Sequence, residues 1–176
     1  MPTNAKTKTK RAARRKAERS HAAAPGSAIA LLKKDHREVE RYFEEFAELE
    51  DNNAKGELAE KICTALKVHT QIEEEIFYPK ARAAIQDNDL LDEALVEHAA
   101  AKHLIAEIGS MKPGDDLYDA KITVLGEQIK HHVKEEEEEL FPEIEDSKMD
   151  VVAVGKQMAT RKAEIMAKAG MMAEAK

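Results

Sequence analysis

The sequence predicts an all-α protein: an up-down-up-down four-helix bundle with a short fifth C-terminal helix and a disordered basic N-terminal tail. Charged residues make up 36% of the chain and aromatic residues 4%, and the abundance of Ala, Glu, Lys and Leu favours helix. Apolar residues recur at helical spacing in four segments of similar length, while runs of alternating β-branched residues are absent. Short loops join these segments, so consecutive helices are expected to lie antiparallel.

The tail, residues 1–26, differs in charge from the rest of the chain. Residues 1–20 hold eight of the 28 Lys and Arg residues but only one of the 35 acidic residues. We expect a disordered arm that contacts the acidic surface of the body, with weak, salt-sensitive contact with nucleic acid as the alternative. No aromatic interleaving and no groove-reading motif supports sequence-specific recognition.

The cysteine content and the hydropathy of the tail indicate the cellular compartment in which the protein is expected. Cys63 is the single cysteine, which excludes an internal disulfide and suits a reducing compartment, so we expect a cytoplasmic protein. The tail has no hydrophobic run long enough for a signal peptide or a membrane span, so no membrane partner is expected. The oligomeric state is left open.

The first two helices follow the tail. Ser27 is a suitable N-cap for the first, which runs to a loop at residues 51–53. The second runs roughly over residues 55–77 and ends near Pro79, because proline lacks the amide hydrogen that a helix interior requires. Residues that follow helical spacing in these two helices include Leu31, Leu32, Val39, Phe43, Phe46, Leu49, Leu58, Ile62, Leu66, Ile72 and Ile76.

The other helices follow a connection at residues 86–89. The third ends at Pro113-Gly114, and the fourth runs roughly over residues 116–140 and ends at Pro142. A fifth, shorter amphipathic stretch covers about 150–174. The expected organisation is therefore a tail at 1–26, a four-helix bundle at 27–146 and a C-terminal helix at 147–176.

The second and fourth helices share a motif. Residues 69–79 read HTQIEEEIFYP and residues 132–142 read HVKEEEEELFP, so that each histidine is followed by a glutamate after four residues and a proline after ten. His36 on the first helix precedes His69 by 33 residues, and His98 on the third precedes His132 by 34. The bundle is thus predicted to contain two copies of one helix pair.

The helical register places the histidine and glutamate of each motif inward. At 100° per residue, His69 and Glu73, like His132 and Glu136, fall within the apolar stripes of their helices. His98 lies near the edge of the stripe of the third helix. His103 and His131 are expected outside the stripes, and His21 belongs to the tail. Most other glutamates of the acidic runs are expected to face solvent: Glu74, Glu75, Glu137 and Glu138, with Glu139 on the border.

Six ionisable side chains inside one bundle require a partner, because burying a single unpaired charge costs several kcal/mol. A metal site removes this cost, since histidine supplies neutral nitrogen ligands and the glutamates lie one turn from a histidine. The predicted metal ligands are His36, His69, Glu73, His98, His132 and Glu136.

The ligand types favour iron, with manganese or zinc as less favoured choices. The set contains no thiolate and exceeds the four ligands of structural zinc, whereas mixed nitrogen and oxygen ligands suit iron. Two near-identical ligand sets favour two ions. Two six-coordinate irons offer about twelve positions, of which the histidines fill about four, bridging glutamates about four and a bridging oxide or hydroxide about two. About two positions remain for water, O2 or peroxide.

This pattern of His36, His69-x-x-x-Glu73, His98 and His132-x-x-x-Glu136 resembles the hemerythrin-like, HHE cation-binding proteins over roughly residues 28–145. The resemblance implies a four-helix bundle with a non-haem di-iron centre that interacts with O2 or its reduced products. It further implies that the four histidines are terminal ligands and that Glu73 and Glu136 bridge the irons.

The chain departs from the oxygen-carrying hemerythrins at two positions. Lys102 stands where the carriers have a histidine one turn after His98, and Glu136 follows His132 by four residues where the carriers use an aspartate at five. One histidine fewer leaves the site more open, which argues against simple reversible O2 carriage. Related bacterial proteins with this reduced ligand set are associated with peroxide breakdown and with sensing or stress roles.

Three functions follow as hypotheses. The first is a di-iron catalyst that reacts with small oxidants, above all hydrogen peroxide, in a catalase-like manner in oxidative-stress defence. The second is a non-catalytic sensor or buffer that binds O2, NO or iron, and the third is a bundle that the metal merely holds together. Tyr42 and Tyr78 are expected to be core or interface residues, with a proton or radical relay beside the metals as the alternative.

Overall fold

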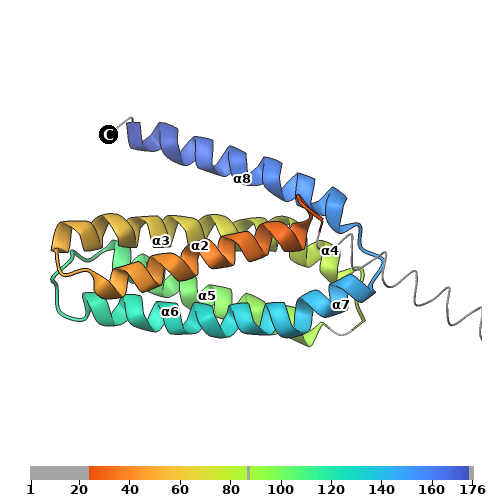
Figure 1. Cartoon of the computed structure of the whole chain (residues 1–176), viewed down its shortest axis with the longest axis horizontal. Coiled ribbons are helices and arrows are strands. Elements are labelled where there is room, and N and C mark those ends of the chain that lie inside the picture. The colour runs from red at the N-terminus through yellow and green to blue at the C-terminus, as the bar shows by residue number, and fades with distance from the viewer. Residues whose placement is uncertain (1–23, 87, 175–176) are drawn as a thin grey trace, which may run out of the picture.

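The computed structural model describes residues 24–86 and 88–174, and these residues form helices and no strand (Figure 1). The predicted four-helix bundle is confirmed. It consists of α2 (Ala28–Glu48), α3 (Asn52–Ile72), α5 (Asp89–Gly109) and α6 (Tyr118–Glu135). Each of these helices packs against its neighbour in the chain, and contacts of α2 with α6 and of α3 with α5 close the ring. None of the described helices is long and apolar enough to cross a membrane.

Side-chain caps decide where the first two helices begin. The Ser27 hydroxyl accepts a hydrogen bond from the Ala30 amide at 3.2 Å, as expected of an N-cap. The Asp51 carboxylate likewise accepts from the Ala54 amide at 2.9 Å. The loop that we expected at residues 51–53 is therefore shorter than predicted, because Asp51 starts α3 at Asn52.

The predicted helix ends at the two prolines are wrong, because both helices continue. α3 passes through a π-helical turn, η1 (Glu73–Phe77), into α4 (Tyr78–Arg82). α6 passes through a second π-helical turn, η2 (Glu136–Leu140), into α7 (Phe141–Asp146).

The π-helical turns explain how the helices accommodate the prolines. The Tyr78 amide bonds to the carbonyl of Glu73, and the Phe141 amide bonds to that of Glu136, five residues back in each case. A wider turn displaces the carbonyls with which a proline ring clashes in a regular α-helix. Each proline then occupies the first turn of the following α-helix, where a missing amide hydrogen costs little.

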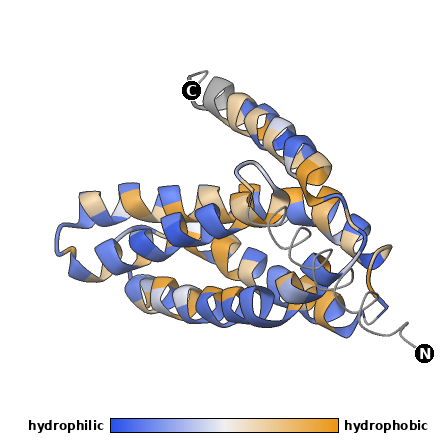
Figure 2. Ribbon diagram, turned by 45° about the vertical axis from the view of Figure 1, so that its right-hand side comes forward, coloured by the Kyte–Doolittle hydropathy of each residue, from blue (hydrophilic) through white to orange (hydrophobic). Residues whose placement is uncertain are grey.

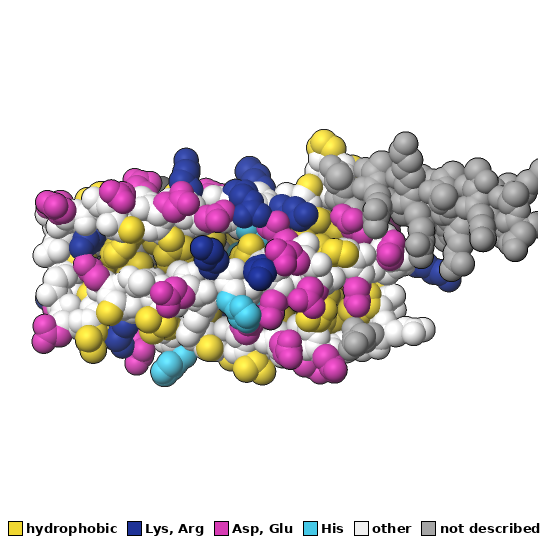
Figure 3. Space-filling view, turned by 60° about the horizontal axis from the view of Figure 1, so that its bottom comes forward, with side chains coloured by type: hydrophobic (Ala, Val, Ile, Leu, Met, Phe, Trp, Pro, Cys, Tyr) yellow, Lys and Arg dark blue, Asp and Glu magenta, His cyan; other side chains and the backbone are white. Residues whose placement is uncertain are grey.

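The core divides into two apolar clusters with a polar layer between them. One cluster joins the start of α2 and the end of α3 to α4, α7 and α8, and includes Leu32, Phe77 and Phe141. The other fills the opposite end of the bundle and includes Val39, Ile62 and Leu125. Figure 2 shows hydrophobic and hydrophilic residues alternating along the helices, as amphipathic helices require. Figure 3 shows acidic and basic side chains interspersed on one face of the molecule.

The fifth helix, α8 (Val151–Glu174), lies across α2, α3 and η1. Its bounds agree with the expected 150–174, but at 24 residues it is not shorter than the bundle helices. Val151, Val154 and Met158 are buried against the bundle, whereas Met166 is 47% exposed, and Figure 1 shows α8 leaving the bundle toward its C-terminus. A Cβ atom at Gly155 would lie 2.3 Å from the carbonyl oxygen of Gly26, so only glycine permits this close approach.

The predicted disordered tail lies mostly outside the described residues, and its disorder and its partners stay predictions.

Candidate metal centre

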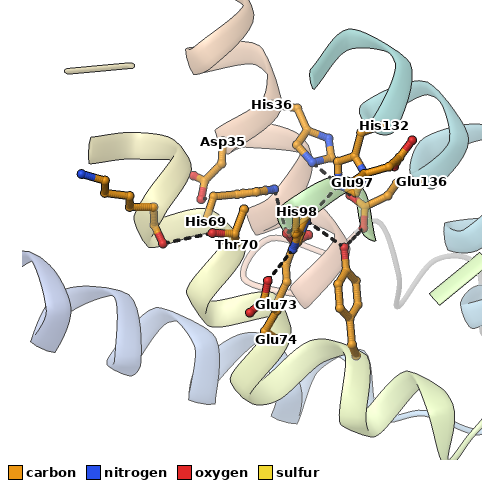
Figure 4. Close-up of polar contacts among 12 residues, drawn as sticks. Asp35, His36, His69, Thr70, Glu73, Glu74, Glu97, His98, His132 and Glu136 are labelled. Atoms are coloured by element: carbon orange, nitrogen blue, oxygen red, sulfur yellow. Dashed lines mark hydrogen bonds and ion pairs between the residues drawn. The ribbon is translucent and has the colours of Figure 1, made fainter. Parts of the chain in front are cut away.

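The six predicted ligands come together in the polar layer between the two apolar clusters (Figure 4). All six are buried, with relative exposures of 6% or less. Their ligand atoms form two groups within 4.8 Å that share Glu73: His36, His69, Glu73 and Glu136 in one, and Glu73, His98 and His132 in the other. The histidine rings pair in the same way, since ring centroids lie 4.9 Å apart for His36 and His69 and 4.8 Å apart for His98 and His132.

Each inward glutamate lies beside one histidine from each helix pair. Glu73 Oε2 is 3.2 Å from His69 Nε2 and 3.5 Å from His98 Nε2. Glu136 Oε2 is 3.3 Å from His36 Nε2 and 3.7 Å from His132 Nε2. Each of the two carboxylates therefore lies close to a histidine of both pairs.

Several atoms of this layer fit a cation and lack another partner. Among the described residues, no hydrogen bond reaches Nε2 of His36 or His69, Oε2 of Glu136, or either carboxylate oxygen of Glu73. Leaving such buried groups unsatisfied costs roughly 1–3 kcal/mol each, and more for a charged group. Neutral imidazole nitrogen and carboxylate oxygen are ligands that a divalent transition metal accepts. The residues present therefore fit a metal centre.

A second carboxylate contacts the far side of each histidine ring. The Nδ1 atoms of His36, His98 and His132 donate to Glu137 at 2.8 Å, Glu74 at 2.9 Å and Glu97 at 2.7 Å, respectively. His69 Nδ1 lies 3.6 Å from Asp35 Oδ2, which is longer than these hydrogen bonds. A carboxylate at Nδ1 fixes the tautomer, so that the Nε2 lone pair faces the centre.

These outer carboxylates correct the prediction that Glu74 and Glu137 face solvent. Each directly follows an inward glutamate, so its side chain crosses to the histidine of a neighbouring helix and is partly buried. Glu75 and Glu138 are exposed as predicted, and Glu139, which was expected on the border, is also exposed. For the other two outer carboxylates the sequence did contain a signal. Asp35 and Glu97 each directly precede a candidate histidine ligand, at matching positions of the repeat.

Basic side chains contact the four outer carboxylates in turn. Arg37 Nη2 bonds to Glu137 at 2.6 Å, and Lys102 Nζ bonds to Glu74 at 2.5 Å. Lys162, from α8, bonds to Asp35 Oδ1 at 2.5 Å, whereas His131 Nε2 lies 3.7 Å from Glu97. The two histidine pairs thus differ in their surroundings, because α8 contributes a cation to one side only.

Burial and mutual charge set the protonation of the inner groups. Burial lowers the pKa of His69, and burial with the neighbouring His132 lowers the pKa of His98 to about 4, so both rings are neutral at pH 7. Burial and the charge of Glu136 raise the pKa of Glu73 well above its usual range. Burial also disfavours ionised Glu136, but contact with His36 and the nearby histidines lowers its pKa to about 2.

Tyr78 belongs to the site, which the sequence left open. Its hydroxyl donates to Glu136 Oε1 at 3.0 Å and lies 3.3 Å from His98 Nε2, while its ring is buried in the core. Burial raises the pKa of Tyr78 well above its usual range, so the phenol stays protonated. Tyr42 instead donates to Glu38 at 2.9 Å and takes no part in the ligand cluster.

The remaining histidines lie as expected where they are described. The side chains of His103 and His131 are 79% and 64% exposed, and neither reaches the inner cluster. His21 lies outside the described residues.

Comparison with known proteins agrees with this geometry. Residues 27–144 match the hemerythrin HHE cation binding domain family. The crystal structure of a hemerythrin HHE cation binding domain-containing protein from Mycobacterium kansasii has the same fold, with a TM-score of 0.70 over 81% of this chain and 89% of that chain at 20% identity.

A curated DNA nickase from Nostoc sp. is 26% identical over 117 residues. The match covers 66% of this chain but only 33% of that protein, so this chain spans about a third of its length. The family match, by contrast, covers more than half of the chain and contains all six candidate ligands. Together with the buried histidine and glutamate clusters, it marks a metal-binding protein. The chain belongs to the hemerythrin HHE cation-binding family.

Proposed function

We propose that the chain holds two iron ions joined by an oxo or hydroxo bridge and disproportionates hydrogen peroxide, as a catalase does. One observation carries the proposal: Glu73 and Glu136 each stand between two histidines that come from different helix pairs. His36 and His69 would bind one ion, and His98 and His132 the other, with the two carboxylates as bridges. Four imidazoles and two carboxylates without a thiolate favour iron over zinc.

A pair of irons supplies the redox chemistry, since two metal centres can accept and return the two electrons that peroxide disproportionation exchanges. Two molecules of hydrogen peroxide give two of water and one of O2, so no external electron donor is needed. The ligand count supports an open site, because Lys102 occupies the position of a possible further histidine and bonds instead to Glu74.

The protein's own contribution is to hold ligands and protons in place. The outer carboxylates orient the imidazoles, and the two apolar clusters cover the polar layer toward both ends of the bundle. The Tyr78 hydroxyl donates a hydrogen bond to Glu136 Oε1 at 3.0 Å and so stabilises and orients that carboxylate.

Metal content, the absorption spectrum and O2 evolution after addition of hydrogen peroxide test the proposal. We expect two irons per chain, near-ultraviolet oxo-bridge bands and sustained O2 release. Two irons with a stable spectral change but no turnover would instead indicate a sensor or buffer of O2 or NO. Zinc alone, or no metal in the folded chain, would overturn the proposal.

Substitution of the two proposed bridging glutamates tests the ligand assignment directly. Glu73→Ala and Glu136→Ala should each lose most of the second iron and reduce O2 evolution by at least tenfold, because a bridge is lost. Glu138→Ala is the matched control, since this exposed glutamate of η2 contacts neither histidine pair. Two irons retained in both bridge variants would contradict the ligand assignment.

A further inference from the structure

A chamber of about 480 Å³ connects the candidate metal centre with the surface. It lies between α2 and α3, below the part of α8 that carries Lys162 and Met166. At its inner end it is lined by the four candidate histidine ligands. Exposed residues of α3, Glu57, Glu60 and Lys61, line the same chamber, so it opens at the surface.

The chamber is far larger than hydrogen peroxide requires. A water molecule takes about 30 Å³ in the liquid, and an apolar cavity of about 150 Å³ is enough to bind benzene. Much of the wall is aliphatic, formed by Val39, Leu66, Val68, Ile129 and Val133. A small organic molecule therefore fits between the mouth and the histidines, with its apolar body against these side chains.

The charges at the mouth select against anions. The charged residues that line the chamber are Glu38, Glu57, Glu60 and Asp35, together with two lysines, Lys61 and Lys162. Lys162 is already bonded to Asp35 at 2.5 Å, which leaves three carboxylates against one lysine. An anionic molecule would meet a negative entrance, whereas a neutral molecule would not.

We propose that the chamber binds small neutral organic hydroperoxides, such as tertiary alkyl or aralkyl hydroperoxides, with the O–O group at the histidine end. This inference rests on the proposed peroxide chemistry and names a further substrate class for the same centre. The O–O bond of the hydroperoxide breaks and takes up two electrons and two protons, giving an alcohol and water. Hydrogen peroxide supplies both electrons and both protons and leaves as O2, so ROOH and H2O2 give ROH, H2O and O2.

Binding is tested first, on the iron-loaded full chain, with 2-phenyl-2-propanol as a redox-inert analogue in a calorimetric titration. We expect one molecule bound per chain. Ala65→Phe, which places a bulky side chain in the chamber wall, should weaken this binding at least tenfold. Ala106→Phe on the exposed side of α5 is the matched control and should bind as the unaltered protein does.

Turnover is tested with cumene hydroperoxide in the presence of hydrogen peroxide, by measuring the alcohol formed. We expect kcat/KM for cumene hydroperoxide to exceed that for an anionic fatty-acid hydroperoxide at least tenfold, and to fall at least tenfold in Ala65→Phe. Iron content and circular dichroism check that this variant folds, and Thr64→Phe in the same wall replaces it if it does not.

The outcomes separate the two proposals. O2 evolution from hydrogen peroxide without binding of the alcohol would overturn the chamber proposal and leave the peroxide proposal intact. Binding that Ala65→Phe abolishes, in a protein that turns over neither peroxide, would uphold the chamber and overturn the proposed reaction. Equal binding in Ala65→Phe and the unaltered protein would place the molecule elsewhere and reject the chamber.

Discussion

At the scale of single residues, the centre depends on carboxylates that do not face it. Glu137, Glu74, Glu97 and Asp35 contact the outer nitrogen of the four histidines, and Arg37, Lys102, His131 and Lys162 contact these carboxylates in turn. Such contacts fix ring orientation and raise the basicity of the inner nitrogen. Charges at the bundle surface therefore act on the buried ligands.

Substitution of Glu137 by Gln should weaken iron binding roughly 10–100-fold, because His36 loses the negative charge at Nδ1. Competition with a chelator of known affinity measures the change. Glu138→Gln removes the next, exposed charge of the same run and should leave affinity within about twofold. Equal weakening by both substitutions would point to the net charge of the run rather than to the contact with His36.

Metal binding should release protons and strengthen as pH rises. Burial and the charge of Glu136 raise the pKa of Glu73, so the metal-free protein keeps a proton there that a bridging carboxylate must lose. Affinity should therefore increase with pH up to the folded pKa of Glu73 and level off above it. Titration of the metal-free protein with ferrous iron in weakly buffered solution measures the protons released, and a pH-independent affinity would contradict this protonation.

At the scale of secondary-structure elements, the two π-helical turns and α8 distinguish this protein from a regular four-helix bundle, and all three lie next to the candidate metal centre. η1 and η2 begin at the two inward glutamates and carry each helix past a proline, so both helices extend beyond the ligand layer. α8 covers α2, α3 and η1, contributes Lys162 to Asp35, and bonds Glu75 through Arg161 Nε at 2.6 Å. The fifth helix is thus coupled to the surroundings of His69.

Gly155→Ala should lower the free energy of unfolding by about 1–3 kcal/mol, because the added methyl group meets the backbone at Gly26 and Ala28. Denaturant unfolding measures this loss. Gly109→Ala is the control, since a Cβ atom there meets nothing within 4 Å and alanine favours helix by roughly 0.5–1 kcal/mol. Equal stability of the two variants would show that α8 does not need its close approach to α2.

At the scale of the whole molecule, the bundle is two related helix pairs whose polar residues meet in one layer. Two apolar clusters flank that layer, so the protein buries six ionisable candidate ligands where a larger core would otherwise lie. A bound cation stabilises such a layer, because it balances the buried carboxylates. Folding and metal binding are therefore expected to be linked.

Removal of the metal by a chelator should lower the midpoint of thermal unfolding by about 10 °C, since a loss of several kcal/mol shifts a domain of this size by about 2–4 °C per kcal/mol. Calorimetry with and without the metal measures the shift. His103→Ala is the control and should show the same shift and the same iron content, because His103 is exposed. An unchanged midpoint would mean that the polar layer is stable by itself.

The sequence by itself determined the all-α fold, because helical spacing of apolar residues is a local property of each segment. It also predicted which six side chains meet, since the two motifs repeat in register and the angle of each residue about its helix follows from its position. Only the tertiary structure decided that Glu74, Glu137 and Tyr78 join the site, that both helices continue past their prolines, and that Lys162 reaches Asp35. These contacts either join residues of different helices or depend on a π-helical turn. They are therefore decided by how the helices pack against one another, which the periodicity of a single helix does not contain.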